Sequence, residues 1–137
     1  METTVIEFHL DGGSGVSPYQ QIVKQVRHAL RLGLLRQGDQ LPTVKDVVAR
    51  LAINPNTVLK AYRELEHDGL VAARPGVGTF ITRELTDTTF AAQGPLRLDL
   101  ERWLTKARRA GLDDESIEAL FQSSFRSAGQ ADQEDIA

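Results

Sequence analysis

Apolar side chains recur every three to four residues in three segments of the first 70 residues, which predicts three amphipathic helices. The first helix starts at Ser17-Pro18, where serine can cap and proline suits the first helical position. Gln20 completes a capping box with Ser17, and Gly38 marks the turn that follows the helix. The apolar positions of this helix are Tyr19, Ile22, Val23, Val26, Ala29 and Leu30.

The second and third predicted helices follow each other with a very short connection. Thr43 and Asp46 carry the Thr-x-x-Asp start signal of a short helix, which ends at Ala52-Ile53. Asn54-Pro55 starts the third helix at once, and Gly69 suits the left-handed conformation that ends it. The predicted buried stripe of the third helix consists of Val58, Ala61, Tyr62 and Leu65.

Two short β-type runs follow the third helix. Residues 70–73 and 79–82 are separated by a glycine-punctuated Arg-Pro-Gly-Val-Gly turn, which predicts a hairpin. A further short strand is compatible with residues 5–10, ahead of a flexible loop at residues 11–15. Three helices followed by a two-stranded hairpin are the layout of a winged helix-turn-helix. We therefore expect a mainly α fold with a small β-hairpin.

The chain beyond the hairpin is organised differently. Its sequence divides into a linker, a region with two more amphipathic helices and a disordered tail. Together with the winged helix, the predicted domains are residues 1–83, 84–95, 96–125 and 126–137, in that order. The two helices of the third domain are separated by Gly111, and Asp113 or Asp114 caps the second of them.

The composition is that of a soluble globular chain, with 41% hydrophobic and 26% charged residues among 137. No stretch approaches the roughly 20 apolar residues of a membrane span, and the N-terminus lacks the features of a signal peptide. The absence of cysteine excludes a disulfide framework, a thiol nucleophile and a cysteine zinc site. We therefore expect a cytoplasmic protein that does not bind membranes.

Signatures of catalysis and of cofactor binding do not occur in the sequence. It contains no GxGxxG motif, no P-loop and no Gly-x-Ser-x-Gly. His9, His28 and His67 are far apart and lack the spacing of metal ligands. The carboxylates at residues 113–115 suit a helix N-terminus better than acid/base chemistry. The expected protein is not an enzyme and needs no cofactor or metal.

The net charge of −3 is unevenly distributed along the chain. Residues 17–83 carry ten Lys or Arg against five Asp or Glu, whereas residues 84–137 carry six against eleven. The first sixteen residues hold three acidic side chains and no basic one. This asymmetry suggests a DNA-facing module joined to an acidic module, although chance scatter in a short chain gives the same picture.

The polar face of the third helix carries side chains suited to reading DNA. In a helix-turn-helix, the second of the two helices enters the major groove and presents its N-terminal residues to base edges. Asn pairs with adenine, Thr bonds to either base edge, and Lys and Arg reach guanine or phosphate. The alternative is a face that only caps the helix and is solvated. The candidate residues are Asn54, Asn56, Thr57, Lys60 and Arg63.

The hairpin tip is a second candidate contact with DNA. Gly76 and Gly78 let the backbone approach a phosphate or the minor groove closely, and Arg74 adds a positive charge. The alternative is an ordinary tight hairpin, which uses glycines in the same way.

Three stretches in consecutive order resemble the GntR family of bacterial regulators: SPYQQIVKQVRHAL, GDQLPTVKDVVARLAINPNTVLKAYRELEHDGLV and RPGVGTFI. The resemblance implies a winged helix that binds inverted-repeat operators as a homodimer. It places DNA contacts on Lys45, on the start of the third helix and on the wing glycine. Lys45 stands in place of a frequent Arg, and Leu59 and Val77 stand in place of frequently basic residues. These departures leave the operator sequence and the affinity open.

The short C-terminal part resembles that of the YtrA-like subfamily, whose two-helix appendage dimerises. Physical reasoning leads to the same expectation, because two amphipathic helices bury both apolar stripes only against a second copy. The alternative is that the stripes pack on the winged helix of the same chain. The candidate interface residues are Leu100, Trp103, Leu104, Ala107, Ile117, Leu120 and Phe121.

Together these features predict a sequence-specific transcription regulator that binds a palindromic double-stranded DNA operator as a homodimer and represses by occluding the promoter. Lys45, Arg63 and Arg74 are expected to contact phosphates, while the third helix selects the sequence. A small-molecule effector, if there is one, is expected in the dimer crevice or between winged helix and appendage, and its identity stays open. One alternative function is a protein-interaction adaptor, which would expose an apolar patch where this chain has a polar one. The other is an architectural DNA binder, which would need a more basic surface.

Overall fold

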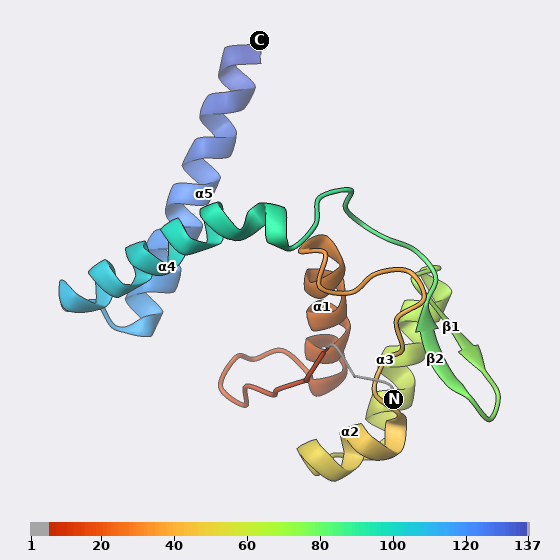
Figure 1. The fold of residues 1–137 in the computed structure, drawn as a ribbon. Coiled ribbons are helices and arrows are strands. Elements are labelled where there is room, and N and C mark those ends of the chain that lie inside the picture. The colour runs from red at the N-terminus through yellow and green to blue at the C-terminus, as the bar shows by residue number, and fades with distance from the viewer. Residues whose placement is uncertain (1–5, 137) are drawn as a thin grey trace. The chain divides into compact units, whose positions relative to one another are not determined.

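The computed structural model of the chain describes residues 6–136, and side chains as far as residue 130. The described chain forms two compact units, the first ending at Gln93 and the second starting at Gly94 (Figure 1). Each unit has its own internal packing and is described by itself below.

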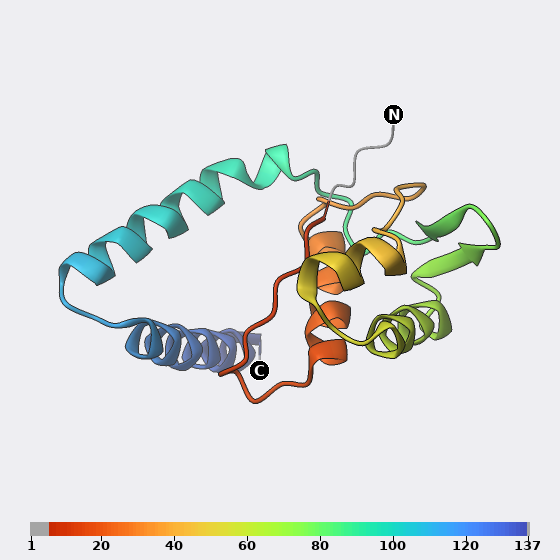
Figure 2. The ribbon, with the colours of Figure 1, turned by 90° about the horizontal axis from the view of Figure 1, so that it is seen from below.

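The first unit is a winged helix-turn-helix, as the sequence predicts. Its elements in chain order are α1 (Pro18–Arg31), α2 (Val44–Leu51), α3 (Pro55–His67), β1 (Val71–Arg74) and β2 (Gly78–Ile81). The predicted apolar stripes of α1 and α3 meet in one core, in which Ile22, Leu30 and Leu65 are fully buried. Burying such side chains is the main source of stability for a unit of this size. Figures 1 and 2 show the hairpin extending beside α3.

Two of the three N-caps predicted for the winged helix are confirmed. The side chain of Thr43 accepts a hydrogen bond from the Asp46 N–H at 3.1 Å, and that of Asn54 accepts one from the Asn56 N–H at 2.8 Å. The prediction for Ser17 is wrong, because its side chain caps no backbone N–H. Its hydroxyl instead donates to the side-chain oxygen of Gln20 at 3.1 Å.

The connection between α2 and α3 is very short and contains a residue other than glycine in the left-handed conformation. Ala52 has a φ of 53° and directly follows the last residue of α2. This conformation costs an alanine about 1–2 kcal/mol, and the surrounding packing has to compensate for it. Asn54 then caps α3, so the chain changes direction within a few residues, as a helix-turn-helix requires.

The wing contains more backbone pairing than the sequence predicts. β1 and β2 pair in antiparallel register, with Val71 opposite Ile81, one residue away from the predicted strand bounds. Residues 38–41 add a third extended segment on the free edge of β2: the Leu41 N–H donates to the Thr79 carbonyl and the Ile81 N–H donates to the Asp39 carbonyl, both at 2.8 Å. This pairing ties the wing to the segment that leads into α2.

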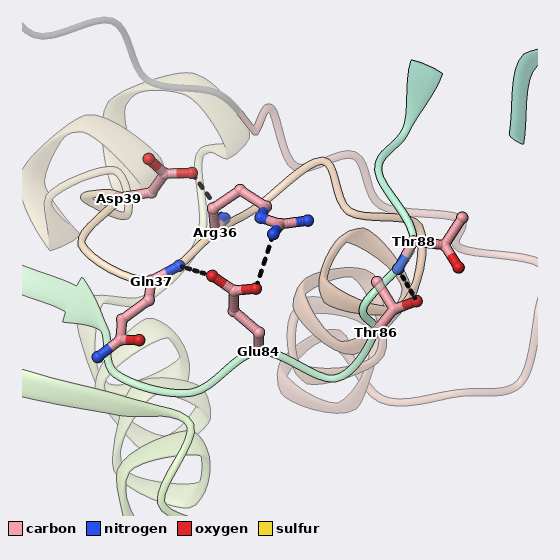
Figure 3. A network of polar contacts seen from close by, with 6 residues as sticks. All are labelled: Arg36, Gln37, Asp39, Glu84, Thr86 and Thr88. Carbon is pink, nitrogen blue, oxygen red and sulfur yellow. Dashed lines mark hydrogen bonds and ion pairs between the residues drawn. The ribbon is translucent and has the colours of Figure 1, made fainter. Parts of the chain in front are cut away.

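The segment at residues 84–90, which we call the docked segment, belongs to the winged-helix unit, although the sequence predicts a linker at residues 84–95. Figure 3 shows Glu84 paired with the Arg36 guanidinium at 2.9 Å and accepting a hydrogen bond from the Gln37 N–H at 3.3 Å. Arg31 donates to the Leu85 carbonyl at 3.1 Å, and the Leu85 side chain packs against the core.

Replacing Gly33 with alanine tests the close packing of the docked segment. Gly33 has a φ of 74°, and a Cβ built on it lies 2.8 Å from the carbonyl oxygen of Thr88. We expect Gly33→Ala to lower the free energy of unfolding by about 2 kcal/mol or more, because a backbone clash adds to the cost of the left-handed conformation. Gly38→Ala is the matched control, since Gly38 also has a positive φ but its Cβ meets no atom within 4 Å. Equal losses for both variants in urea unfolding would contradict the close packing.

Tyr62 provides a pH-dependent contribution to the stability of the first unit. Its side chain is buried, and its hydroxyl donates to the Pro42 carbonyl at 2.6 Å. Burial, with a smaller contribution from the Asp46 carboxylate, raises the pKa of the Tyr62 phenol well above its usual value. The folded state therefore favours the neutral phenol, and this contribution is complete below the unfolded pKa of about 10.

The stability that Tyr62 contributes is expected to disappear in alkali. Above pH about 10, it should fall by about 1.4 kcal/mol per pH unit as the unfolded phenol ionises. Tyr62→Phe should cost about 1 kcal/mol at neutral pH, because the Pro42 carbonyl loses its donor. The variant should also lack this part of the alkaline decline. Urea unfolding of both proteins between pH 8 and pH 11 measures how the free energy of unfolding changes with pH, and the same decrease in both proteins above pH about 10 would contradict the prediction.

The second unit consists of two helices, α4 (Gly94–Arg109) and α5 (Asp114–Ile136), preceded by a short 3-10 helix at Ala91–Gln93. The two helices diverge from their connecting turn (Figures 1 and 2). Of the two candidate caps, Asp113 is the one that caps: its side chain accepts a hydrogen bond from the Ser116 N–H at 2.8 Å. Gly111 has a φ of 96° in the turn, as predicted.

Two terminal predictions differ from the structure. α5 continues to Ile136, so most of the segment predicted as a disordered tail at residues 126–137 is helical; Ala137 lies outside the described residues. Residues 6–10 form no strand, and Val5, where the predicted strand starts, also lies outside the described residues. Two glutamine side chains of α1 hold this N-terminal stretch by its backbone, and such contacts leave no sequence periodicity.

Candidate nucleic-acid interface

The exposed face of α3 is fixed by the burial of its opposite face. Val58, Ala61 and Leu65 are completely buried. Side chains at the intervening positions therefore point away from the core. The predicted reading residues Asn54, Asn56, Lys60 and Arg63 are exposed, and Thr57 is half-buried.

Lys60 is held by an aromatic partner that sequence reasoning did not identify as a functional residue. Its ammonium nitrogen lies 4.0 Å from the centre of the Tyr19 ring, at the start of α1. Such a cation–π contact stabilises an exposed cation by about 0.5–1 kcal/mol and restricts its position. The sequence indicates Tyr19 only as an apolar position of α1. Its contact with Lys60 depends on the packing of α1 against α3, for which the sequence gives no local signal.

Lys45 lies beside the start of α3. It is an exposed residue in the first turn of α2, and together with Pro55 it lines a shallow apolar depression between the two helices. The structure therefore brings Lys45 together with the N-terminal end of the reading helix, as the sequence-based interpretation requires. A cation at this place is suited to a phosphate next to the bases that α3 faces.

The wing presents one organised cation and two glycines with different roles. The Arg74 guanidinium stacks on the ring of Phe80, 4.6 Å from its centre. A Cβ on Gly78 would collide with the side chain of Gln40, which donates to the Val77 carbonyl at 3.2 Å. This flexible side chain could move aside, but Gly78 also has a φ of 147°, a conformation that residues with a Cβ rarely adopt, so the backbone of the wing requires glycine there. Gly76 has no atom within 4 Å of a Cβ position, so its backbone is open to a ligand.

The candidate cations are not neutralised by carboxylates. Among the described residues, Lys45, Lys60, Arg63 and Arg74 form no ion pair with an acidic side chain. By contrast, Arg27, Arg36 and Arg50 of the same unit are paired with Asp68, Glu84 and Glu7, respectively. Among the described residues of this unit, cations without an ion pair are thus found on α2, α3 and the wing, which are the elements that contact DNA in a winged helix, and also at Lys24 and Arg31 of α1 and at Arg83.

The first unit combines a short-turned helix-turn-helix, whose second helix exposes a polar face, with an adjacent wing, and both the second helix and the wing carry unpaired cations. This combination defines a DNA-binding protein of the winged-helix class. Comparison with known proteins agrees. Residues 18–81 match the family described as "Bacterial regulatory proteins, gntR family". The chain is 31% identical over 109 residues to the HTH-type transcriptional repressor YtrA of Bacillus subtilis, and the aligned region covers 79% of this chain and 84% of that protein. The chain belongs to the GntR family of bacterial transcription regulators.

Two solved structures extend the similarity beyond the winged helix. YtrA from Sulfolobus acidocaldarius, a GntR-family transcription factor, matches with a TM-score of 0.52 and 26% identity, over 72% of this chain and 97% of that chain. A transcriptional antiterminator from Listeria monocytogenes matches with a TM-score of 0.57 and 26% identity, over 88% of this chain and 91% of that chain. The predicted fold and the predicted family are confirmed. Within the described residues, no helix has the length and apolar character needed to cross a membrane.

Proposed function

We propose that the protein is a repressor that binds a palindromic operator as a homodimer, with one winged helix on each half-site. The observation that carries the proposal is the combination, in one chain, of a third helix with an exposed polar face and a second unit that leaves several large apolar side chains exposed. The half-sites would then lie about one helical turn apart, roughly 34–36 Å.

The contacts with DNA divide into two groups in this proposal. Lys45, Arg63 and Arg74 contact phosphates, because they are exposed cations without acidic partners among the described residues. The residues at the start of α3 select the sequence by bonding base edges, which is the chemistry of their amide, hydroxyl and ammonium groups. The sequence-selecting residues are Asn54, Asn56, Thr57 and Lys60.

The second unit supplies the surface for dimerisation. Leu100, Leu120 and Phe121 are each close to 45% exposed. Together with the half-buried Trp103 and Leu104, Leu100 and Phe121 border a groove of about 240 Å³ between α4 and α5. A second copy can fill this groove and cover the apolar side chains around it, as an isologous dimer does.

Two of the predicted interface residues have a different role. Ala107 and Ile117 are buried inside the hairpin, close to the turn where α4 and α5 meet. They hold the two helices together within one chain. We therefore assign the intermolecular contact to the other predicted residues, which are Leu100, Trp103, Leu104, Leu120 and Phe121.

A gel-shift assay with purified protein tests the proposed function. The probe is the DNA upstream of the protein's own gene, and an unrelated fragment of equal length is the competitor. We expect specific retardation at nanomolar protein and physiological salt, since specific sites are bound about 10³–10⁷-fold more tightly than other DNA. If the probe is not specifically retarded, genomic DNA fragments bound by the protein are isolated and footprinted. If these fragments also show no inverted repeat, the proposal fails in favour of an adaptor or an architectural binder.

A further inference from the structure

A small cavity lies on the winged-helix unit, outside the proposed DNA contacts. It has a volume of about 220 Å³, lies between residues 6–8 of the N-terminal stretch and one face of α2, and is partly open to solvent. Phe8, Val47 and Leu51 give it apolar walls, and three charged side chains, Glu7, Asp46 and Arg50, border it.

The N-terminal wall of this cavity is fixed in place. The Gln25 side chain accepts a hydrogen bond from the His9 N–H at 3.1 Å and donates one to the His9 carbonyl at 2.7 Å. Gln21 forms the same pair of bonds with Asp11, at 2.7 Å and 3.0 Å. Phe8 is buried in the core. These contacts hold the wall in place before any ligand arrives, which lowers the entropic cost of binding.

The α2 wall of the cavity carries a carboxylate without a partner. Glu7 and Arg50 neutralise each other in an ion pair of 3.1 Å. The third charged group, the Asp46 carboxylate, forms no hydrogen bond or ion pair within the part of the chain that the structure describes. The cavity is thus lined by apolar groups and one uncompensated negative charge.

We propose that this cavity binds a small organic cation, namely a primary ammonium group on a short apolar body. The ammonium pairs with the Asp46 carboxylate, and the body packs on Phe8, Val47 and Leu51. The size of the ligand follows from the volume, which is below the roughly 300–1,000 Å³ of sites for drug-sized molecules. An anion of the same size is disfavoured, because it would face the net negative charge that Asp46 gives to the rim of the cavity.

Two probes of equal length test the proposal, n-hexylammonium and hexanoate, each titrated into the uniformly ¹⁵N-labelled full chain at pH 7. We expect hexylammonium to shift the backbone amide signals of residues 6–9 and 44–51 in a saturable manner, and hexanoate to leave them unchanged. Asp46→Asn should weaken binding of hexylammonium at least about 10-fold, because it removes the charge but keeps the size of the side chain. The amide spectrum of the variant shows directly whether it is folded.

Asp87→Asn is the matched control, since it removes the same charge from an exposed residue that does not border the cavity. It should bind hexylammonium as the unmodified protein does. The proposal is overturned if both probes bind equally well, if the shifts do not saturate or fall elsewhere in the chain, or if the Asp46 and Asp87 variants lose the same affinity. Because none of these measurements uses DNA, the outcome of the ligand titration does not depend on the proposed function.

Discussion

Replacing Phe121 with glutamate is expected to convert the proposed dimer into monomers and to weaken binding to a complete operator about 100-fold or more. Phe121 is 44% exposed on α5, stacks on Phe125 with ring centres 5.9 Å apart and borders the groove of the second unit. A carboxylate at this place must be desolvated without a partner when two copies meet, at a cost of several kcal/mol. Loss of the second winged helix then removes the gain from simultaneous binding of two half-sites.

Sedimentation equilibrium measures the mass of this variant, and gel shifts compare a complete operator with a single half-site. Binding to the half-site should be unchanged, because α3 and the wing belong to the other unit. Gln122→Glu is the matched control: it adds the same charge at the neighbouring exposed position of α5. A Phe121→Glu protein that stays dimeric would show that the dimer forms through another surface.

Replacing Lys60 with alanine is expected to weaken operator binding about 10-fold or more while leaving the dimer intact. Lys60 is exposed on the reading face of α3, and its ammonium is placed over the Tyr19 ring. A good contact with a base is worth about 1–3 kcal/mol. Binding as tight as that of the unmodified protein would show that the assigned reading face is wrong.

The salt dependence of binding distinguishes the two ways in which Lys60 can act. If it contacts a phosphate, its removal lowers the slope of log K against log salt by about 1 for every DNA sequence. If it contacts a base, its removal relaxes the preference at one operator position instead. Lys24→Ala, at an exposed lysine on α1, controls for the loss of one positive charge. Tyr19→Phe should keep the position of Lys60, whereas Tyr19→Leu should not, because only phenylalanine preserves the ring.

The features that the sequence predicts correctly are those encoded within a few residues. Thr43 and Asn54 start their helices as predicted, since each cap bonds to an N–H two or three residues further on. The buried stripe of α3 follows directly from helical periodicity, and so does the exposure of the opposite face. The failure at Ser17 shows the limit of such signals, because its hydroxyl donates to the Gln20 side chain and accepts no backbone N–H, although the sequence pattern is that of a cap.

Features that depend on residues distant in sequence could not be predicted. The contact between Tyr19 and Lys60, the approach of Gln40 to Gly78 and the docking of Glu84 on Arg36 all join segments that are distant in sequence and meet only in the folded unit. The length of α5 was missed for another reason. Its apolar repeat ends near Phe125, but alanine and glutamine beyond that point still have good helix propensity, so the helix continues without an apolar stripe.

The docked segment changes how freely the two units are tethered. A flexible chain of the predicted linker length, residues 84–95, would have a root-mean-square span of about 20 Å. With residues 84–90 packed on the winged helix, only the 3-10 helix Ala91–Gln93 separates that packing from the start of α4, and at a rise of about 2 Å per residue it spans about 6 Å. The effective concentration of a tethered partner rises as the tether shortens towards the distance that it has to bridge. In the proposed dimer, the short polar contacts around Arg36 would therefore promote occupation of the second half-site once the first is bound.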